Sequence, residues 1–574
     1  MPEITCPYRS GDDILTSDRQ GFDRRWYAKN LDRVYTPTTA DEAVAAAKEF
    51  SLLYQHDEVQ ITCGRHCYEN FVYSEKTKCI VDVTGLRAFG LHNERGYYIE
   101  VGNNNWDMYV ILNNMFGRTL PAGSCYSVGL GGHITGGGYG FLSRLHGLTI
   151  DWLTGADIVV LRDGSVELIY CSETQYPDLF WAIRGGGGGN FGIITCYYFK
   201  ELPRSPDYVY YSLISIPWEG QDGKLLSSDK FYDIMTTFAE YECSQNSETW
   251  AYYNILHVNH RLTKLPMTLA SVAYYDRTRE QSLEIFQRRL QNDINARRER
   301  YKRIAGITED PPALLGHPWL SHVGLFKKAA ENQSYRRFTY LEGCQALNGS
   351  GPNRYGKYKS AYHTAPLSRA QTEACYNYMS FNEATRPSAY EDADLSASLF
   401  QIDSYGCQIN QKDPDATAIP QRSSTMKFQY QSYWLEDVDN WTDNKSKADA
   451  NMKWLNDMYS EIYSRWGGTP GLGYGPHEAV DGCYFNYCDS DLGVNNSAYS
   501  TNGSDLTPWA LYYGWNNLMF PHGGGLIDIK QRWNPDNWFA SAQSLPLWAS
   551  KPNKEELEQL RRKLEASRSA VTAS

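Results

Sequence analysis

The sequence predicts an α+β protein with more than one domain, and three observations lead to this prediction. The chain has 574 residues, which is more than one hydrophobic core normally organises. Its first 200 residues alternate short apolar runs with a helical pattern, and its later part changes to tyrosine-rich alternation and long charged helices. With 42% hydrophobic and 21% charged residues the chain can bury a substantial core, which excludes wholesale disorder.

A β-α-β unit is predicted near the N-terminus. Residues 33–37 and 59–62 are typical of strands, and residues 79–83 form the next apolar run. Between the first two, Thr39 precedes Glu42 and an alanine-rich stretch with the spacing of a capping box, which predicts a helix starting here. These elements make the first part of an α+β domain.

A second region begins after the proline pair in residues 202–206. Residues 208–211 predict a strand and residues 280–300 a charged helix. Two-residue alternation returns at residues 399–403 and 426–430, and it points alternate side chains to the same face of a sheet. Gln401 and Asp403 should therefore share a face. Residues 552–569 predict an exposed terminal helix with no chemistry.

The charge balance limits the partners that this chain can have. The net charge is −12 and the isoelectric point is about 5.6, which argues against a nucleic-acid or anionic-membrane surface. No apolar run is long enough to span a membrane and the start lacks a secretory pattern, so we expect a cytoplasmic location. The thirteen cysteines lack zinc-type spacing, so neither a metal nor a disulfide framework is expected. A small-molecule substrate is the remaining expectation.

Three glycine-rich clusters dominate the first part of the chain, at residues 64, 129–140 and 185–192. Glycine costs chain entropy and is tolerated where backbone must turn tightly or approach a ligand closely. Backbone N–H groups in such loops bind phosphates. No cluster fits a P-loop or a Rossmann fingerprint. A dinucleotide held by a different fold is therefore predicted.

Several longer motifs accompany these glycines. They are TCGRHCYE at 62–69, PAGSCYSVG at 121–129, RLHGL at 144–148, GSGPN at 349–353, YFNY at 484–487 and WNPDNWF at 533–539. Over about residues 20–546 the chain resembles the FAD-linked oxidases of the vanillyl-alcohol oxidase type, in the berberine-bridge-enzyme-like branch and its hexose oxidase group. This resemblance implies a two-part FAD-binding domain, plus a substrate domain with a large antiparallel sheet and covering helices. The implied boundaries are 1–205 for the first part of the FAD-binding domain, 206–500 for the substrate domain, and 501–574 for the return to the FAD-binding domain.

The resemblance also implies an FAD bound covalently at two points, through His66 to the 8α-methyl group and through Cys125 to C6 of the flavin. Imidazole nitrogen and thiolate are nucleophiles that can bond an electrophilic flavin. The alternative is a turn histidine and a buried apolar cysteine. Arg65 departs from the family, which has two glycines before this histidine; it could reach a pyrophosphate or disturb a turn. The cofactor-binding residues implied are His66, Cys125, Cys63, Gly64, Arg65, Cys67, Tyr68, Val128, Gly129, Gly131, Gly132, His133, Gly136, Gly138, Asn190, Gly192 and Ile193.

On the reacting side, the resemblance makes Tyr487 the base for the substrate hydroxyl and Asp403 the acceptor of its proton. A free phenol is a weak base at neutral pH, so it needs such a partner. Gln401, Gln429 and Tyr484 are expected to contact the substrate. Tyr139 is a further expected substrate contact, at a position where hexose oxidase is expected to have an acidic residue. The alternative for Asp403 and the glutamines is a solvated sheet face.

Two functions follow from these expectations. The first is an oxidase that converts C1 of a hexose or oligosaccharide to the lactone and returns the electrons to O2 as hydrogen peroxide. The second is a tailoring oxidase for an alcohol on a glycosylated or polyketide-like metabolite, which Tyr139 favours. A flavin-fold binding protein without turnover is a third class, and the presence of Tyr487 and Asp403 argues against it. The sequence does not indicate the oligomeric state.

Overall fold

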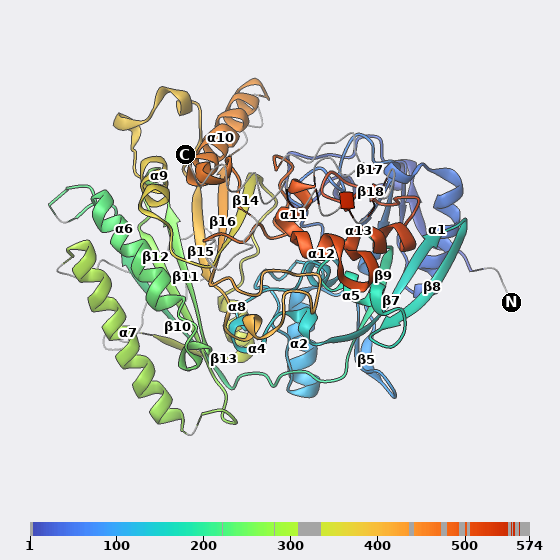
Figure 1. The fold of residues 1–574 in the computed structure, drawn as a ribbon, viewed down its shortest axis with the longest axis horizontal. Helices are drawn as coiled ribbons and strands as arrows, with labels where there is room; N and C mark the ends of the chain where they lie inside the picture. The colour runs from blue at the N-terminus through green and yellow to red at the C-terminus, as the bar shows by residue number, and fades with distance from the viewer. Residues whose placement is uncertain are drawn as a thin grey trace.

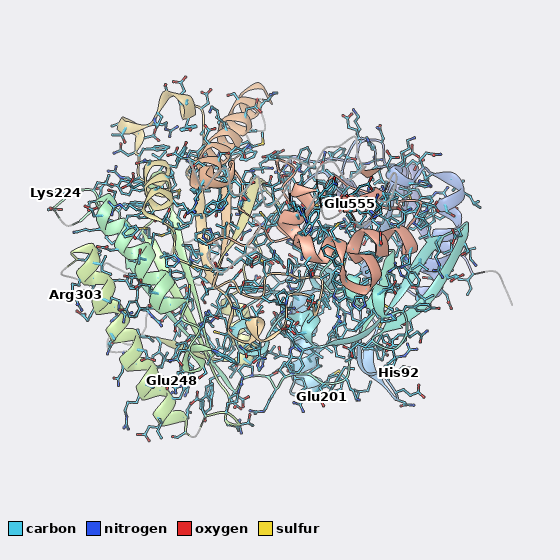
Figure 2. All side chains as sticks on the ribbon, viewed as in Figure 1. His92, Glu201, Lys224, Glu248, Arg303 and Glu555 are labelled. Atoms are coloured by element: carbon cyan, nitrogen blue, oxygen red, sulfur yellow. The ribbon has the colours of Figure 1, made fainter. Side chains whose placement is uncertain are left out.

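The computed structural model of the chain has two lobes (Figure 1). It describes residues 4–307 without 221 and 281, and residues 335–435, 441–471, 479–492, 500–501 and 506–548. Five positions between 553 and 562 are also described. Charged residues such as Lys224, Glu248 and Arg303 lie at the outer edge of the molecule and are exposed (Figure 2). In the described part of the chain, no helix combines the length and the apolar character needed to cross a membrane.

The first lobe begins with a four-stranded sheet in the order β1-β2-β4-β3. Its strands are β1 (Tyr8–Ser10), β2 (Arg33–Tyr35), β3 (Val59–Thr62) and β4 (Cys79–Asp82). Strands β2 and β3 both pair with β4 in parallel, and α1 (Ala40–Leu53) connects them. The Thr39 side chain accepts a hydrogen bond from the Glu42 N–H and so caps α1. The predicted β-α-β unit is confirmed.

An antiparallel five-stranded sheet completes this lobe, in the order β5-β6-β9-β7-β8. Its strands are β5 (Phe89–His92), β6 (Gly96–Glu100), β7 (Leu153–Arg162), β8 (Ser165–Ser172) and β9 (Ile193–Phe199). Helix α1 packs against β7, β8 and β9. The glycine-rich loops are joined to the short helices α2 (Asn105–Phe116), α3 (Leu130–Thr135), α4 (Ser143–His146) and α5 (Pro177–Ile183).

The second lobe is built on an antiparallel seven-stranded sheet, in the order β13-β10-β12-β11-β15-β16-β14. The strands are β10 (Tyr208–Ile216), β11 (Tyr252–Asn259), β12 (Met267–Tyr275), β13 (Arg336–Thr339), β14 (Tyr355–His363), β15 (Leu399–Ser404) and β16 (Met426–Trp434). The associated helices are α6 (Ser228–Thr237), α7 (Leu283–Ala305), α8 (Tyr340–Ala346), α9 (Arg369–Met379) and α10 (Trp441–Ile462). Helices α6, α7, α9 and α10 cover the outer face (Figure 1), so the other face is free to meet the first lobe.

The chain then returns to the first lobe. Strand β17 (Ser500–Thr501) pairs in parallel with β18 (Leu547–Trp548), and α11 (Thr507–Tyr513), α12 (Trp515–Met519) and α13 (Pro521–Trp533) lie between them. Helix α13 packs against α5 and β7. The domain boundaries remain a prediction, which this course of the chain supports. Most of the predicted helix at 552–569 falls outside the described residues.

Candidate active site

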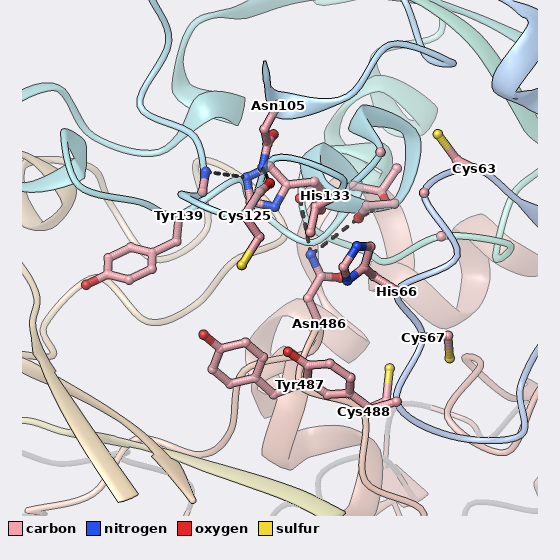
Figure 3. Close-up of a pocket in the computed structure, with 18 of the residues that line it drawn as sticks. Cys63, His66, Cys67, Asn105, Cys125, His133, Tyr139, Asn486, Tyr487 and Cys488 are labelled. Carbon is pink, nitrogen blue, oxygen red and sulfur yellow. Dashed lines mark hydrogen bonds between the residues drawn. The ribbon is translucent and has the colours of Figure 1, made fainter. Parts of the chain in front are cut away.

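A cavity of about 410 Å³ lies where the glycine-rich loops meet the free face of the seven-stranded sheet. Figure 3 shows Cys125 and His66 on one side of this cavity and Tyr487 across from them. Most of the predicted site residues line it, and they come from separate segments of the chain. These are Cys63, Gly64, Arg65, His66, Cys67, Tyr68, Cys125, Val128, Gly129, Gly131, Gly132, His133, Tyr139, Gly192, Gln401, Asp403, Gln429, Tyr484 and Tyr487.

Four residues predicted to bind the cofactor, Gly136, Gly138, Asn190 and Ile193, are not among the residues that line the cavity. A Cβ atom on Gly136 would lie 2.1 Å from Asn486, and one on Gly138 would lie 2.3 Å from Thr149. Asn190 is fully buried beneath the glycine loop and donates to the Gly186 carbonyl. Ile193 begins β9 and is fully buried, whereas the next residue, Ile194, lines the cavity, as expected for side chains that alternate along a strand. The contact of these four residues with a cofactor remains a prediction.

The first two glycine clusters cross each other in close contact. A Cβ atom on Gly64 would lie 2.1 Å from the backbone nitrogen of Gly129, and one on Gly129 would lie 2.3 Å from the sulfur of Cys63. No side chain fits at either position. The crossing therefore fixes the loop that carries His66 against the loop that carries Cys125.

Gly132 and Gly188 have open space where a side chain would project. A Cβ atom on Gly132 would meet no atom within 4 Å, and one on Gly188 would meet only the Thr135 hydroxyl at 3.6 Å. Both residues line the cavity. Bare backbone beside open space suits the close approach of a large planar or phosphate-bearing ligand. These residues fit an FAD.

We expect the substitution Gly132→Ala to leave the fold intact and to weaken FAD binding about tenfold, because a methyl group in a filled site costs about 1–3 kcal/mol. The FAD concentration that gives half-maximal flavin incorporation into the apo-protein measures this effect. Gly64→Ala is the contrasting variant, because its Cβ would clash with protein and disturb the fold itself. An unchanged FAD concentration for half-maximal incorporation in Gly132→Ala would contradict the placement of the cofactor over this loop.

The imidazole of His66 is held on two sides. Its Nε2 atom lies 2.8 Å from the Ser127 hydroxyl oxygen, and its ring stacks on Phe22 with a centroid distance of 5.1 Å. Burial lowers the pKa of His66 to about 4. The ring is therefore neutral at physiological pH and has a nitrogen lone pair that can act as a nucleophile.

Cys125 lies on the loop that follows the buried Leu120 and Ala122. Its carbonyl accepts a hydrogen bond of 3.1 Å from the Asn105 side chain, and its thiol is free. Burial raises the pKa of this thiol to about 11. The thiol is thus protonated before it reacts, and a bond to a ligand requires removal of its proton.

Arg65 has the left-handed backbone conformation that was expected of a turn here, with a φ of 61°. Its guanidinium group is held by two acidic side chains. It forms an ion pair with Asp82 at 2.5 Å and a second with Asp18 at 3.1 Å. Arg65 therefore braces the loop that carries His66, and this contact offsets the backbone strain of a non-glycine residue.

Polar side chains from β15 and β16 form two neighbouring rows on the sheet face. Asp403 pairs with Lys427 across the strands, and Gln401 pairs with Gln429. The prediction that Gln401 and Asp403 share a face is confirmed, because both line the cavity. The Gln401 amide donates a hydrogen bond of 3.1 Å to Asp403. These rows offer a carboxylate, an amine and two amides to a ligand.

Lys427 is the central cation of this face. Its Nζ atom donates a hydrogen bond of 2.9 Å to the phenol oxygen of Tyr487 and lies 3.7 Å from the Asp403 carboxylate. Burial lowers the pKa of Lys427 to about 8, although Asp403 opposes this shift. Burial and the charge of Asp403 raise the pKa of Tyr487 well above its usual value. Lys427 therefore lies between the two residues predicted to exchange a proton.

Aromatic rings surround this amine. The Lys427 Nζ atom is 4.1 Å from the ring centroid of Tyr487, 4.4 Å from that of Tyr139 and 4.5 Å from that of Tyr484. Tyr139 also donates a hydrogen bond of 3.1 Å to the Ser404 carbonyl. Tyr139 thus helps to enclose Lys427.

A buried ion cluster links the loop of His66 to the loop of Tyr487. Lys357 donates to Glu69 at 2.6 Å and to Asp489 at 2.8 Å, and all three side chains are about 1% exposed. Lys359 binds Asp489 at 2.8 Å but makes no ion pair with Glu69 in the described chain. Glu69 lies three residues after His66, and Asp489 lies two after Tyr487. Lys357 therefore holds both loops to the same strand, β14.

Sequence reasoning did not identify Lys427 or Ser127. Lys427 lies two residues before Gln429 in the alternating run at 426–430, so the alternation predicts that both side chains are on the same face of the sheet. Its pairing with Asp403 depends on the register between β15 and β16, which no local pattern gives. Ser127 carried no signal, because its contact with His66 joins two separate loops.

Comparisons with known proteins agree with this geometry. Residues 31–169 match the FAD binding domain family. Hexose oxidase of Chondrus crispus is 36% identical over 567 residues, which cover 95% of both chains. The chain belongs to the FAD-linked oxidoreductases that include hexose oxidase. The predicted resemblance and fold class are thereby confirmed for this hexose-oxidase-like chain.

Two other similar proteins are an oxidase and a flavoenzyme. Aclacinomycin-N/aclacinomycin-A oxidase of Streptomyces galilaeus is 28% identical and covers 93% of the chain and 87% of its own length. The solved structure of CrmK, a flavoenzyme of caerulomycin biosynthesis, is 27% identical, covers 95% of this chain and 100% of its own, and has a TM-score of 0.72. The chain is therefore an FAD-dependent oxidoreductase by family.

Proposed function

We propose that this protein oxidises a sugar hydroxyl, converting C1 of a hexose or oligosaccharide to the lactone, with an FAD bound through His66 and Cys125. O2 receives the electrons and leaves as hydrogen peroxide. The observation that carries the proposal is the Tyr487–Lys427 pair, which lies in one cavity with His66 and Cys125. Hexose oxidase, a relative that is 36% identical and covers 95% of this chain, favours a sugar as the substrate.

The flavin would lie over the open backbone at Gly132 and Gly188, between His66 and Cys125. When bound, it accepts a hydride from the substrate and passes the electrons to O2. Two bonds to the protein would fix its ring plane against the sheet face. The neutral imidazole of His66 is suited to form the first of them.

Tyr487 takes the proton of the substrate hydroxyl. Because its pKa is raised, the Tyr487 phenol can accept the substrate proton only if another group first takes the phenol's own proton. Lys427 is in hydrogen-bond contact with the phenol and can take it. The Tyr487–Lys427 pair is therefore active after it has lost one proton in total, wherever that proton was held. Asp403 lies beside Lys427 and stabilises its charged form. The proton released by Tyr487, which the sequence predicted would pass to Asp403, is therefore held by Lys427.

The sugar would bind along the two polar rows. Gln401 and Gln429 present amide groups that donate to and accept from hydroxyl groups. The Gln429 amide also donates a hydrogen bond of 3.4 Å to Tyr68, whose ring stacks near Tyr487 at 5.9 Å. These contacts would hold a polyhydroxylated ring beside the base.

A second candidate is a tailoring oxidase that acts on an alcohol of a glycosylated or polyketide-like metabolite. The apolar wall beside the polar rows favours it, because an aromatic or aliphatic aglycone would bury well there. This wall comprises Phe141, Tyr211, Tyr253, Ile255, Ala270 and Val272. Aclacinomycin oxidase among the relatives also favours this candidate.

One experiment on the purified protein tests the proposal and separates the two candidates. We expect a yellow pellet after acid precipitation, because a covalent flavin stays with the protein, and peroxide release from several hexoses and disaccharides. A yellow pellet with peroxide only from glycosylated natural products would favour the tailoring oxidase. A colourless pellet would contradict covalent attachment.

A further inference from the structure

The hydroxyl of Ser127 is the hydrogen-bond partner of the His66 imidazole. The distance between the Ser127 oxygen and the His66 Nε2 atom is 2.8 Å. Ser127 lies two residues beyond Cys125 on the same loop. A single short loop therefore carries one proposed flavin anchor and a contact to the other.

The second lobe holds this loop in place. The Ser127 N–H donates to the Ser350 hydroxyl oxygen at 3.2 Å, and the two serine oxygens are also 3.2 Å apart. The Tyr126 N–H donates to the Asn348 side chain at 3.1 Å. Because these contacts fix the backbone of the loop, the Ser127 oxygen has a defined position relative to His66.

The protonation of His66 determines which nitrogen can react. A neutral imidazole carries one N–H group and one nitrogen lone pair. In the part of the chain that the structure describes, Nε2 is the ring nitrogen with a hydrogen-bond partner. If Nε2 carries the proton and donates it to Ser127, the lone pair is on Nδ1. Stacking on Phe22 fixes the direction of that lone pair.

We propose that Ser127 is a positioning residue for flavin attachment: it accepts the Nε2–H of His66 and so keeps the Nδ1 lone pair available for the 8α carbon. This inference rests on the proposed covalent FAD. The N–C bond forms as one C–H bond of the 8α-methyl group and the N–H bond of His66 break. The two electrons and the two protons, one from the 8α carbon and one from Nε2 by way of the Ser127 hydroxyl, reduce O2 to hydrogen peroxide.

The test compares Ser127→Ala with Ser127→Thr, which keeps the hydroxyl, and uses His66→Ala as a reference without this anchor. Mass spectrometry of proteolytic peptides measures the flavin-bearing fraction at His66 and at Cys125 over time after FAD is added. We expect attachment at His66 to be about tenfold slower in Ser127→Ala, which is the size of effect expected for one lost hydrogen bond. Attachment at Cys125 should be unchanged, and Ser127→Thr should behave as the wild type.

Three outcomes would overturn the inference. Wild-type attachment in Ser127→Ala would show that the hydroxyl is not needed, and a defect as large in Ser127→Thr would assign the effect to the shape of the loop. In either case, the proposed function is still supported if the wild-type protein carries flavin at His66 and Cys125. Absence of flavin from both residues of the wild type would remove the covalent cofactor and this inference together. Circular dichroism of each variant checks that the fold is retained.

Discussion

Tyr487→Phe is expected to reduce the rate of flavin reduction by about 10²–10⁴-fold, which is the usual contribution of a positioned general base. The ring and its contacts with Tyr484 and Tyr68 remain, at 5.0 and 5.9 Å in the wild type, and only the phenol oxygen is lost. Rapid mixing with a hexose in the absence of O2 isolates this half-reaction. Binding of the sugar should change little, because the polar rows are intact.

Tyr484→Phe is the matched control for this variant. Tyr484 has a similar ring next to Lys427, at 4.5 Å, but its hydroxyl contacts Asn486 at 3.4 Å and makes no hydrogen bond to Lys427 in the described chain. We expect its rate to stay within about tenfold of the wild type, as for the loss of one hydrogen bond. Equal losses in the two variants would contradict the role of Tyr487 as the base.

Lys427→Met is expected to lower the same rate by about 10²-fold at pH 7, because Tyr487 then has no adjacent group to hold its proton. Methionine has a similar length and keeps the packing among Tyr139, Tyr484 and Tyr487. The double variant Lys427→Met/Tyr487→Phe should be no slower than Tyr487→Phe alone, because the two residues act as a unit. Losses that multiply would show that they act independently.

The pH dependence has a definite sign. Burial lowers the pKa of Lys427 to about 8, and the pair is active after it has lost one proton, so activity should rise with pH up to about 8 and then level off. In Lys427→Met the remaining group is Tyr487, whose pKa is raised well above 10 by burial and by Asp403. Its activity should still be rising at the alkaline end of the range. A profile that does not change on substitution would contradict the pairing.

The sequence predicted the elements that have strong local signals. The helix after Thr39 begins with the cap that its spacing indicates, and the runs at 399–403 and 426–430 are central strands of the large sheet. Two-residue periodicity was enough to place Gln401 and Asp403 on one face. The glycine clusters indicated a nucleotide site because so many glycines have few other uses.

Pairings between distant segments could not be predicted in the same way. The contact of Lys427 with Tyr487 joins a strand to a loop 60 residues away, and it depends on how that loop returns over the sheet. Asn190 was expected at the cofactor, but its position below the loop is set by contacts with Gly186 and Tyr513. The motifs thus indicated which segments lie near the site. Which atoms of these segments contact each other depends on the tertiary structure.

The most direct test of sugar oxidation is to mix the wild-type protein with a hexose in the absence of O2 and record the visible absorbance of the flavin. We expect complete bleaching, formation of the lactone in an amount equal to the flavin, and recovery of the colour with release of peroxide when O2 is admitted. A flavin that stays oxidised with every hexose and disaccharide, in a protein that carries it at His66 and Cys125, would contradict sugar oxidation.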